Sequence, residues 1–230
     1  MASACGVLRP DAGAPDYDSV RERLSLSANE RRAEAATVRV RNLGCDALST
    51  GSGFVVGERE LVTNAHVVAG AEKLEITTWD GHTLNASVEG ATVSADLARV
   101  RVDADLPPPA TLAPADPVPG DALVVYGYPG GGALDAEAGS LISYADVDGQ
   151  RSFLMTNEVR PGNSGGPVFG ASGEVVGVVR ALLVDADQGV AIPVSVLSAT
   201  NGSALTEGIP GCEGAGGASG RLQDQDGAPS

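Results

Sequence analysis

One serine lies in a loop whose composition suits nucleophilic catalysis. Ser164 stands in the segment Gly162-Asn163-Ser164-Gly165-Gly166-Pro167. Glycine takes positive φ without steric cost, so the backbone around Ser164 can turn sharply and bring amide N–H groups together. Two such amides, those of Gly162 and Ser164, could stabilise the negative oxygen of a tetrahedral intermediate, as an oxyanion hole does. The segment therefore predicts acyl-transfer chemistry with Ser164 as the nucleophile.

A general base and the carboxylate that orients it are expected upstream. His66 lies in Thr63-Asn64-Ala65-His66-Val67-Val68, where an apolar strand gives way to one helical turn. Asp96 stands at the entry to another apolar strand, where its carboxylate could accept a hydrogen bond from His66 Nδ1 and favour the imidazolium. The second histidine, His82, lies in an expected hairpin and is interpreted as a surface residue. The chain order His, Asp, Ser is one of the orders in which such triads occur.

The elements that must position these residues have the pattern of β-strands. Apolar and polar residues alternate in Thr37-Val38-Arg39-Val40-Arg41 and in Lys73-Leu74-Glu75-Ile76-Thr77. The pair Asp80-Gly81 between two strand-like runs predicts a hairpin. A proline-dense strap divides the β region into two similar halves. The histidine and the aspartate lie in the first half and the serine in the second, so we expect an all-β double barrel with its site in the seam.

The expected organisation has three parts. Ser27 followed three places later by Glu30 predicts a capping box that opens a short helix ending near Ala36. The parts are an N-terminal extension over 1–35, a β domain over 36–205 and a glycine-rich, mostly disordered tail over 206–230. Within the β domain we expect barrel one over 36–105, a linker over 106–120, and barrel two with a short C-terminal helix over 121–205.

Three motifs together resemble the trypsin-like serine proteases of the HtrA/Deg group. They are 63–68, 96–98 and 162–167, and the resemblance extends over residues 37–200. It implies a chymotrypsin-like pair of six-stranded antiparallel β-barrels and a serine endopeptidase with the triad His66, Asp96 and Ser164. It also implies an acyl-enzyme intermediate and protein or peptide substrates. The sequence contains no cluster of metal-ligand residues and no cofactor-binding motif, so neither metal nor cofactor is expected.

A narrower similarity concerns the cysteines. Segment 126–132 and the positions of Cys45 and Cys212 are similar to the protease domain of the actinobacterial acid-resistance periplasmic proteases. This similarity implies a Cys45–Cys212 disulfide and an extracytoplasmic location, in the periplasm, in the envelope or secreted. From the residues alone, three cysteines allow one pair of undetermined connectivity, and three reduced thiols are the alternative. The PDZ domain usual in HtrA proteins is not expected, since 30 residues follow Thr200.

Composition argues against several other classes of function. The formal net charge is −15 over 230 residues, and a chain with no basic patch is a poor partner for nucleic acid. It contains no apolar run of about 18 residues that could span a membrane. Segment 130–132 lacks the helix that follows a dinucleotide-binding glycine loop. Two alternatives to an enzyme are a catalytically silent binding protein of the same fold and an acidic scaffold module.

Substrate preference should be set by residues just before the serine loop and on the strands beside it. Val159 and Ala191 favour a pocket for a small apolar side chain. Glu158 favours a basic side chain if it points inward. We expect the apolar pocket. The residues predicted to shape the pocket are Glu158, Val159, Arg160, Val179, Arg180 and Ala191.

Overall fold

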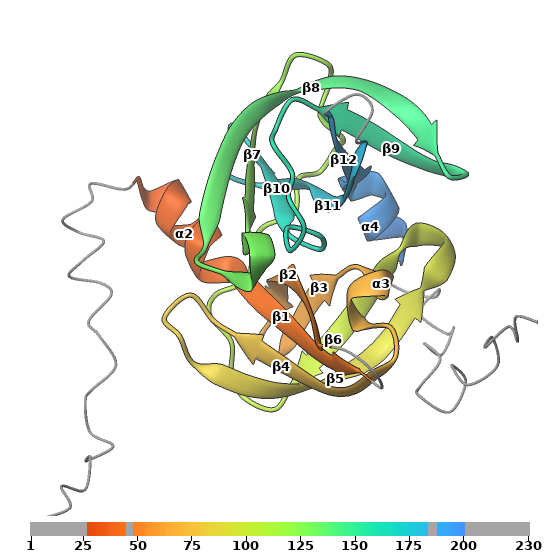
Figure 1. The fold of residues 1–230 in the computed structure, drawn as a ribbon. Helices are drawn as coiled ribbons and strands as arrows, with labels where there is room; N and C mark the ends of the chain where they lie inside the picture. The colour runs from red at the N-terminus through yellow and green to blue at the C-terminus, as the bar shows by residue number, and fades with distance from the viewer. Residues whose placement is uncertain (1–26, 45–47, 184–187, 201–230) are drawn as a thin grey trace, which may run out of the picture.

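Two closed β-barrels, each of six antiparallel strands, form the fold and lie one above the other in Figure 1. The computed structural model describes residues 27–44, 48–183 and 188–200. The strand order is β1-β2-β3-β6-β5-β4 in barrel one and β10-β11-β12-β9-β8-β7 in barrel two. Closure pairs every strand on both sides and leaves no sheet edge. The expected double barrel with a short C-terminal helix is confirmed.

Barrel one carries the histidine and the aspartate. Its strands are β1 (Thr37–Gly44), β2 (Leu48–Gly57), β3 (Glu60–Thr63), β4 (Ala71–Thr77), β5 (Thr83–Thr92) and β6 (Leu97–Val102). The alternation seen in the sequence puts Val38 and Val40 of β1 inside the barrel, where both are fully buried. The expected hairpin joins β4 to β5, and Gly81 takes a φ of 86° in its turn.

Barrel two carries the serine loop. Its strands are β7 (Ala122–Gly127), β8 (Asp135–Val147), β9 (Gln150–Met155), β10 (Pro167–Gly170), β11 (Val175–Leu183) and β12 (Gln188–Pro193). The serine loop connects β9 to β10. The one-turn 3₁₀ helix η2 (Pro129–Gly131) follows β7.

Two longer helices flank the barrels. α2 (Ala28–Ala36) starts with the predicted capping box, in which Glu30 Oε2 accepts the Ser27 N–H at 2.7 Å and Ser27 Oγ accepts the Glu30 N–H at 3.2 Å. Two otherwise unpaired amides at the helix start are thereby satisfied. α4 (Val194–Thr200) follows β12 and packs against β11 and β12.

An apolar layer between the barrels holds them together. Phe54 and Leu97 of barrel one belong to the same buried cluster as Val178 and Ile192 of barrel two. All four side chains are at most 1% exposed. Full burial of one such side chain stabilises a fold by about 1.5–3 kcal/mol. This layer keeps the two barrels in a fixed relation, which a site built from both of them requires.

The connection between the barrels is anchored to barrel two by Asp116. Its Oδ2 accepts an Arg151 Nη1–H at 2.6 Å, and its Oδ1 accepts the Ser195 N–H at the start of α4 at 2.9 Å. Burial raises the pKa of the Asp116 carboxyl, but the hydrogen bonds from Arg151 and Ser195 outweigh it, so the pKa lies below its ordinary value. Beside it, burial raises the pKa of Tyr144 to about 12. At neutral pH the ionised carboxylate of Asp116 therefore holds the segment between the barrels against barrel two.

Some expectations fall on residues outside the described part of the chain. Cys5, Cys45 and Cys212 are among them, as is the tail over 206–230. The cysteine pairing and the disordered tail therefore stay predictions. In the part that is described, β6 ends at Val102 and β7 begins at Ala122.

Candidate active site

A single helical turn holds His66. β3 ends at Thr63, and α3 (Ala65–Val68) follows directly, as the sequence predicts. Val67 and Val68 are buried against barrel one, whereas the His66 side chain is 51% exposed. The buried valines fix the turn, and the imidazole is left on its open side. Asn64, just before the turn, donates its Nδ2–H to the Asp96 carbonyl at 2.9 Å.

The Asp96 carboxylate contacts both the backbone and the ring of His66. Its Oδ1 accepts the His66 backbone N–H at 3.1 Å, and its Oδ2 lies 2.9 Å from His66 Nδ1. An ionised carboxylate only accepts hydrogen bonds, so the proton on this side of the ring sits on Nδ1 and Nε2 is left as the basic nitrogen. Asp96 has a left-handed backbone, with φ of 51° and ψ of 42°, between η1 (Val93–Ala95) and β6. Aspartate tolerates this conformation better than most residues.

The loop of Ser164 is held by backbone hydrogen bonds on both sides. Gly165 donates its N–H to the Val179 carbonyl at 2.9 Å, and the Ser164 carbonyl accepts the Ser52 N–H of barrel one at 2.8 Å. Gly162 and Gly165 take φ values of 100° and 84°, which only glycine adopts at low cost. The Ser164 hydroxyl donates to the Arg180 carbonyl at 3.3 Å. Two barrels thus clamp this loop between them.

The expected oxyanion donors lie in this loop. Among the described residues, the amides of Gly162 and Ser164 donate no hydrogen bond to another protein group. Free amides at a sharp turn are the groups that an anionic oxygen can use. No hydrogen bond within the described part of the chain joins His66 to Ser164. In ligand-free sites such bonds are often long and tighten when substrate binds.

Arg180 on β11 touches both parts of the arrangement. Its carbonyl accepts the Ser164 hydroxyl, and its Nε lies 3.8 Å from Asp96 Oδ2. The guanidinium also donates to the Val147 carbonyl at 2.9 Å, so the side chain is held on barrel two and is 16% exposed. Asp96 belongs to barrel one, and this ion pair therefore crosses the seam. It connects the serine loop with the histidine–aspartate pair.

The other residues expected to shape a substrate pocket separate into two groups. Val159, Val179 and Ala191 belong to the interior cluster of barrel two and are at most 3% exposed. Arg160 is shared between Asp135, Glu137 at 3.0 Å and Glu158 at 3.6 Å, and the Glu158 side chain is 67% exposed. The apolar members therefore lie within the barrel wall, while the charged members lie at its surface.

Comparison with known proteins places the chain in a family. Residues 51–178, more than half of its length, match the trypsin-like peptidase domain. The chain belongs to this family. The putative serine protease HhoB of Synechocystis is 36% identical over 162 residues, which cover 66% of this chain and 39% of that relative. The serine protease Rv3671c of Mycobacterium tuberculosis is 33% identical over 166 residues, covering 66% and 41%.

A solved structure agrees with the sequence comparisons. The crystal structure of the Rv3671c protease from M. tuberculosis in its active form superposes on this trypsin-like peptidase with a TM-score of 0.74 and 26% identity. The match covers 90% of this chain and 99% of that one. A probable periplasmic DegP-like serine endoprotease of Halomonas elongata is 38% identical over 138 residues, covering 56% of this chain and 29% of the relative. The chain spans about two fifths or less of the length of these curated relatives.

Sequence reasoning missed Ser52 of this trypsin-like peptidase, whose side chain on β2 is fully buried and contacts the serine loop. It named Arg180 as a pocket residue but did not foresee the ion pair of Arg180 with Asp96. A signal for Ser52 was present in its neighbours. A Cβ on Gly51 would come within 2.6 Å of Val67, and one on Gly53 within 2.9 Å of the Val62 carbonyl. Glycine on both sides of a small polar residue indicates such a close approach.

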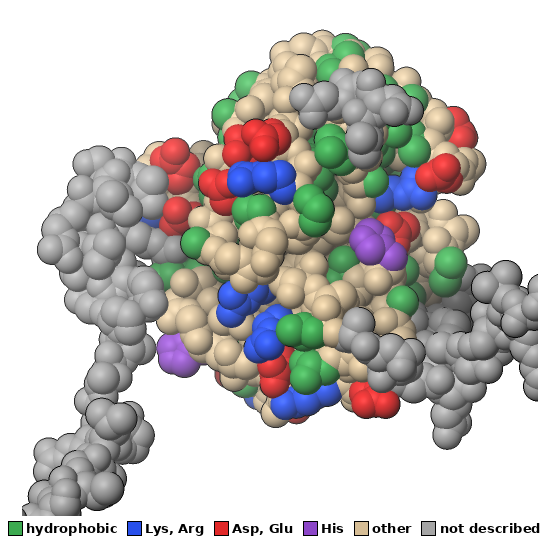
Figure 2. Space-filling view, in the orientation of Figure 1, with side chains coloured by type: hydrophobic (Ala, Val, Ile, Leu, Met, Phe, Trp, Pro, Cys, Tyr) green, Lys and Arg blue, Asp and Glu red, His purple; other side chains and the backbone are tan. Residues whose placement is uncertain are grey.

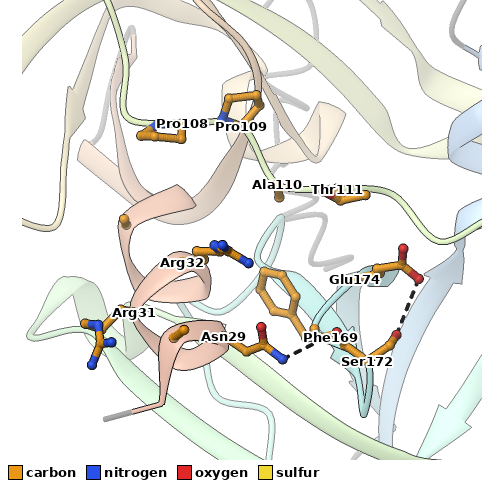
Figure 3. Close-up of a pocket in the computed structure, with 13 residues that line it drawn as sticks. Asn29, Arg31, Arg32, Pro108, Pro109, Ala110, Thr111, Phe169, Ser172 and Glu174 are labelled. Atoms are coloured by element: carbon orange, nitrogen blue, oxygen red, sulfur yellow. Dashed lines mark hydrogen bonds between the residues drawn. The ribbon is translucent and has the colours of Figure 1, made fainter. Parts of the chain in front are cut away.

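A separate cavity of about 590 Å³ opens between α2 and the turn joining β10 to β11. Figure 3 shows Arg32 of α2 directed toward Phe169, and the Nδ2 of Asn29 donating to the Ser172 carbonyl at 3.4 Å. None of the triad residues lines this cavity, which is therefore separate from the proposed active site.

On the face drawn in Figure 2, acidic and basic side chains are interspersed without a large basic patch.

Two further findings concern the described residues only. No group of three or more His, Cys, Asp and Glu side chains among them could hold a metal ion. No helix in that part of the chain is long and apolar enough to cross a membrane.

Proposed function

We propose that this trypsin-like peptidase is a serine endopeptidase acting through His66, Asp96 and Ser164. The observation that carries the proposal is the double contact of Asp96 with the His66 ring and backbone, at 2.9 and 3.1 Å, beside a serine loop with free amides. A carboxylate in that position fixes the neutral tautomer and stabilises the imidazolium. The family membership of the chain supports the same activity.

The mechanism follows from these positions. His66 Nε2 takes the proton of Ser164 Oγ as the oxygen attacks the carbonyl carbon of a peptide bond. The amides of Gly162 and Ser164 stabilise the oxyanion of the tetrahedral intermediate. The imidazolium then gives its proton to the leaving amine, and the C–N bond breaks to leave an acyl-enzyme. A water molecule activated by His66 hydrolyses that ester and restores the free serine.

The substrate pocket is proposed to accept a small apolar side chain. Val159, three positions before Gly162, and Ala191 supply small apolar side chains in the interior of barrel two, and the carboxylate of Glu158 lies 3.6 Å from Arg160 Nε. An unengaged carboxylate would be needed to attract a basic side chain strongly. Cleavage-site profiling on a peptide library tests this choice. Preference for Lys or Arg before the cleaved bond would refute it.

The chain is proposed to act on proteins of the cell envelope or exterior. Relatives named as periplasmic support this location, and the proposed Cys45–Cys212 disulfide fits an oxidising compartment. Such a bond closes a loop of about 170 residues and stabilises the fold by at most roughly 4–5 kcal/mol. Alkylation in cells followed by non-reducing peptide mapping tests both points. Free thiols at both positions, or a bond from either of them to Cys5, would contradict the pairing.

Replacement of Ser164 by alanine tests the proposed activity. The hydroxyl makes one long hydrogen bond, so Ser164→Ala should fold with a similar melting temperature and lose casein hydrolysis by about 10⁶-fold. Ser172→Ala, the same change at an exposed turn of barrel two, should keep wild-type activity. Wild-type protein that does not cleave casein or library peptides would favour the silent binding protein. Residual activity within about tenfold in Ser164→Ala would exclude Ser164 as the nucleophile.

A further inference from the structure

We propose that the hydroxyl of Ser52 is a positioning group that keeps the oxyanion hole assembled. Ser52 belongs to β2 of barrel one, whereas the oxyanion loop belongs to barrel two. The proposal rests on the proposed function, because it assigns the amides of Gly162 and Ser164 to the reaction. Ser52 itself does not contact the substrate; its hydroxyl acts by holding the serine loop in position.

The Ser52 hydroxyl accepts one hydrogen bond and donates another, and both partners belong to barrel two. Ser52 Oγ accepts the Tyr128 N–H at 2.9 Å and donates its proton to the Gly162 carbonyl at 2.7 Å. The serine is fully buried, so water cannot replace either partner without a rearrangement. Ser52 therefore bridges two segments of barrel two that are separate in sequence.

The backbone of Ser52 adds two contacts. Its N–H donates to the Ser164 carbonyl at 2.8 Å, and its own carbonyl accepts the Thr63 hydroxyl at 2.7 Å. One residue of barrel one thus contacts the carbonyls of both residues whose amides form the proposed oxyanion hole. The Thr63 contact in turn fixes Ser52 to the strand that leads to His66.

These contacts determine where the Gly162 amide points. The Pro161 carbonyl accepts the Gly130 N–H at 2.7 Å. A trans peptide unit is planar, so its N–H points opposite to its carbonyl, and the Gly162 N–H is directed away from Gly130. The next peptide unit is held through the Gly162 carbonyl by Ser52 Oγ. Both peptide units that flank Gly162 are therefore fixed.

The hydroxyl matters because glycine restrains its own backbone little, so hydrogen bonds from its surroundings must hold it. Besides the bond to Ser52, the Gly130 N–H donates to the Pro161 carbonyl at 2.7 Å and the Asn163 N–H donates to the Arg160 carbonyl at 3.0 Å. Gly162 has a φ of 100°, and glycine passes easily between positive and negative φ. Loss of the Ser52 hydroxyl would remove the donor that holds the buried Gly162 carbonyl. A shift of the Gly162 backbone would let this carbonyl find another donor. The amide would then leave the position that the oxyanion requires.

The test compares Ser52→Ala with Ser152→Ala. Ser152 is also fully buried and also donates one hydrogen bond, to the Gln150 carbonyl at 3.3 Å, but within barrel two and away from the serine loop. Both variants are measured at a temperature where they are folded. In Ser52→Ala we expect kcat to fall at least tenfold with KM within about threefold. The hydrogen bond from the Gly162 amide to the oxyanion is made in the transition state, so its loss lowers kcat more than it changes KM. Ser152→Ala should keep the wild-type kcat.

Two further readouts separate positioning from a loss of stability. The affinity of a peptide boronate, which forms a tetrahedral adduct, should weaken in parallel with kcat/KM in Ser52→Ala, while that of a cleaved product peptide stays unchanged. Amide hydrogen exchange over residues 158–166 should accelerate in Ser52→Ala and not in Ser152→Ala. Ser52→Thr keeps the hydroxyl and should regain at least part of the lost kcat.

The exchange measurement needs no turnover and so decides on Ser52 independently of the proposed function. Equal exchange over 158–166 in Ser52→Ala and Ser152→Ala, or equal kcat in the two variants, overturns the positioning role. Accelerated exchange in Ser52→Ala of a chain whose wild type cleaves nothing would support the structural link and refute the endopeptidase instead.

Discussion

Replacement of Gly162 by alanine tests whether the conformation of the serine loop is required for the chemistry. A Cβ at this position would lie 2.4 Å from the Tyr128 carbonyl oxygen and 2.8 Å from the Gly130 nitrogen. The φ of 100° also lies in the region that alanine avoids. Left-handed backbone costs alanine about 1–2 kcal/mol, and overpacking a filled site costs about 1–3 kcal/mol more. We therefore expect Gly162→Ala to lose about 2–5 kcal/mol of unfolding free energy.

A matched control exists at Gly120, which has a φ of 95° and no atom within 4 Å of its added Cβ. Gly120→Ala should lose only the backbone part, about 1–2 kcal/mol, and keep its kcat. Gly162→Ala should also lose about 10²–10³ in kcat, since its amide leaves the oxyanion position. Urea unfolding and hydrolysis of a chromogenic peptide measure the two effects. Equal unfolding free energies in both variants, with kcat values within about threefold, would refute the reasoning.

Two other substitutions probe the carboxylates. Asp96→Asn should lower kcat by about 10⁴ with little change in melting temperature, because an amide can present the wrong group to His66 and favour the unproductive tautomer; a loss below tenfold would contradict the orienting role. Asp116→Asn should destabilise the fold at neutral pH by about 1–2 kcal/mol, since the carboxylate holds Arg151 and the start of α4 at Ser195. The pKa of Asp116 is lowered in the folded state, so this contribution is present above the ordinary value of 3.8 and is lost as pH falls through the folded pKa. Unfolding measured from pH 7 to pH 3 should show the two proteins converging at the acid end, and a constant gap would contradict the assignment.

Local features of the fold were predictable because short segments determine them. The capping box at Ser27, the Asp80-Gly81 hairpin and the helical turn of His66 each depend on a few neighbouring side chains. The position of Asp96 at a strand entry was predictable for the same reason. These residues gave the correct barrels and a candidate triad whose histidine and aspartate the structure brings together.

Contacts between distant segments could not be predicted in this way. Ser52 and Gly162 are 110 positions apart, and only the packed seam brings the hydroxyl to the carbonyl. Val179 was expected at a pocket because the strand over 178–181 was expected to lie beside the loop. Its side chain faces the barrel interior, since successive residues on a strand point to opposite faces. Alternation alone does not say which face of a strand near a site is open.

Covalent labelling of Ser164 tests the central claim most directly. Wild-type protein treated with a fluorophosphonate probe, digested and analysed by mass spectrometry should carry one adduct, on the peptide that contains Ser164. The labelling rate should fall by at least a hundredfold in His66→Ala, because the serine then lacks its base. Absence of any adduct on folded wild-type protein, or an adduct on a different serine, would contradict the assignment of this triad.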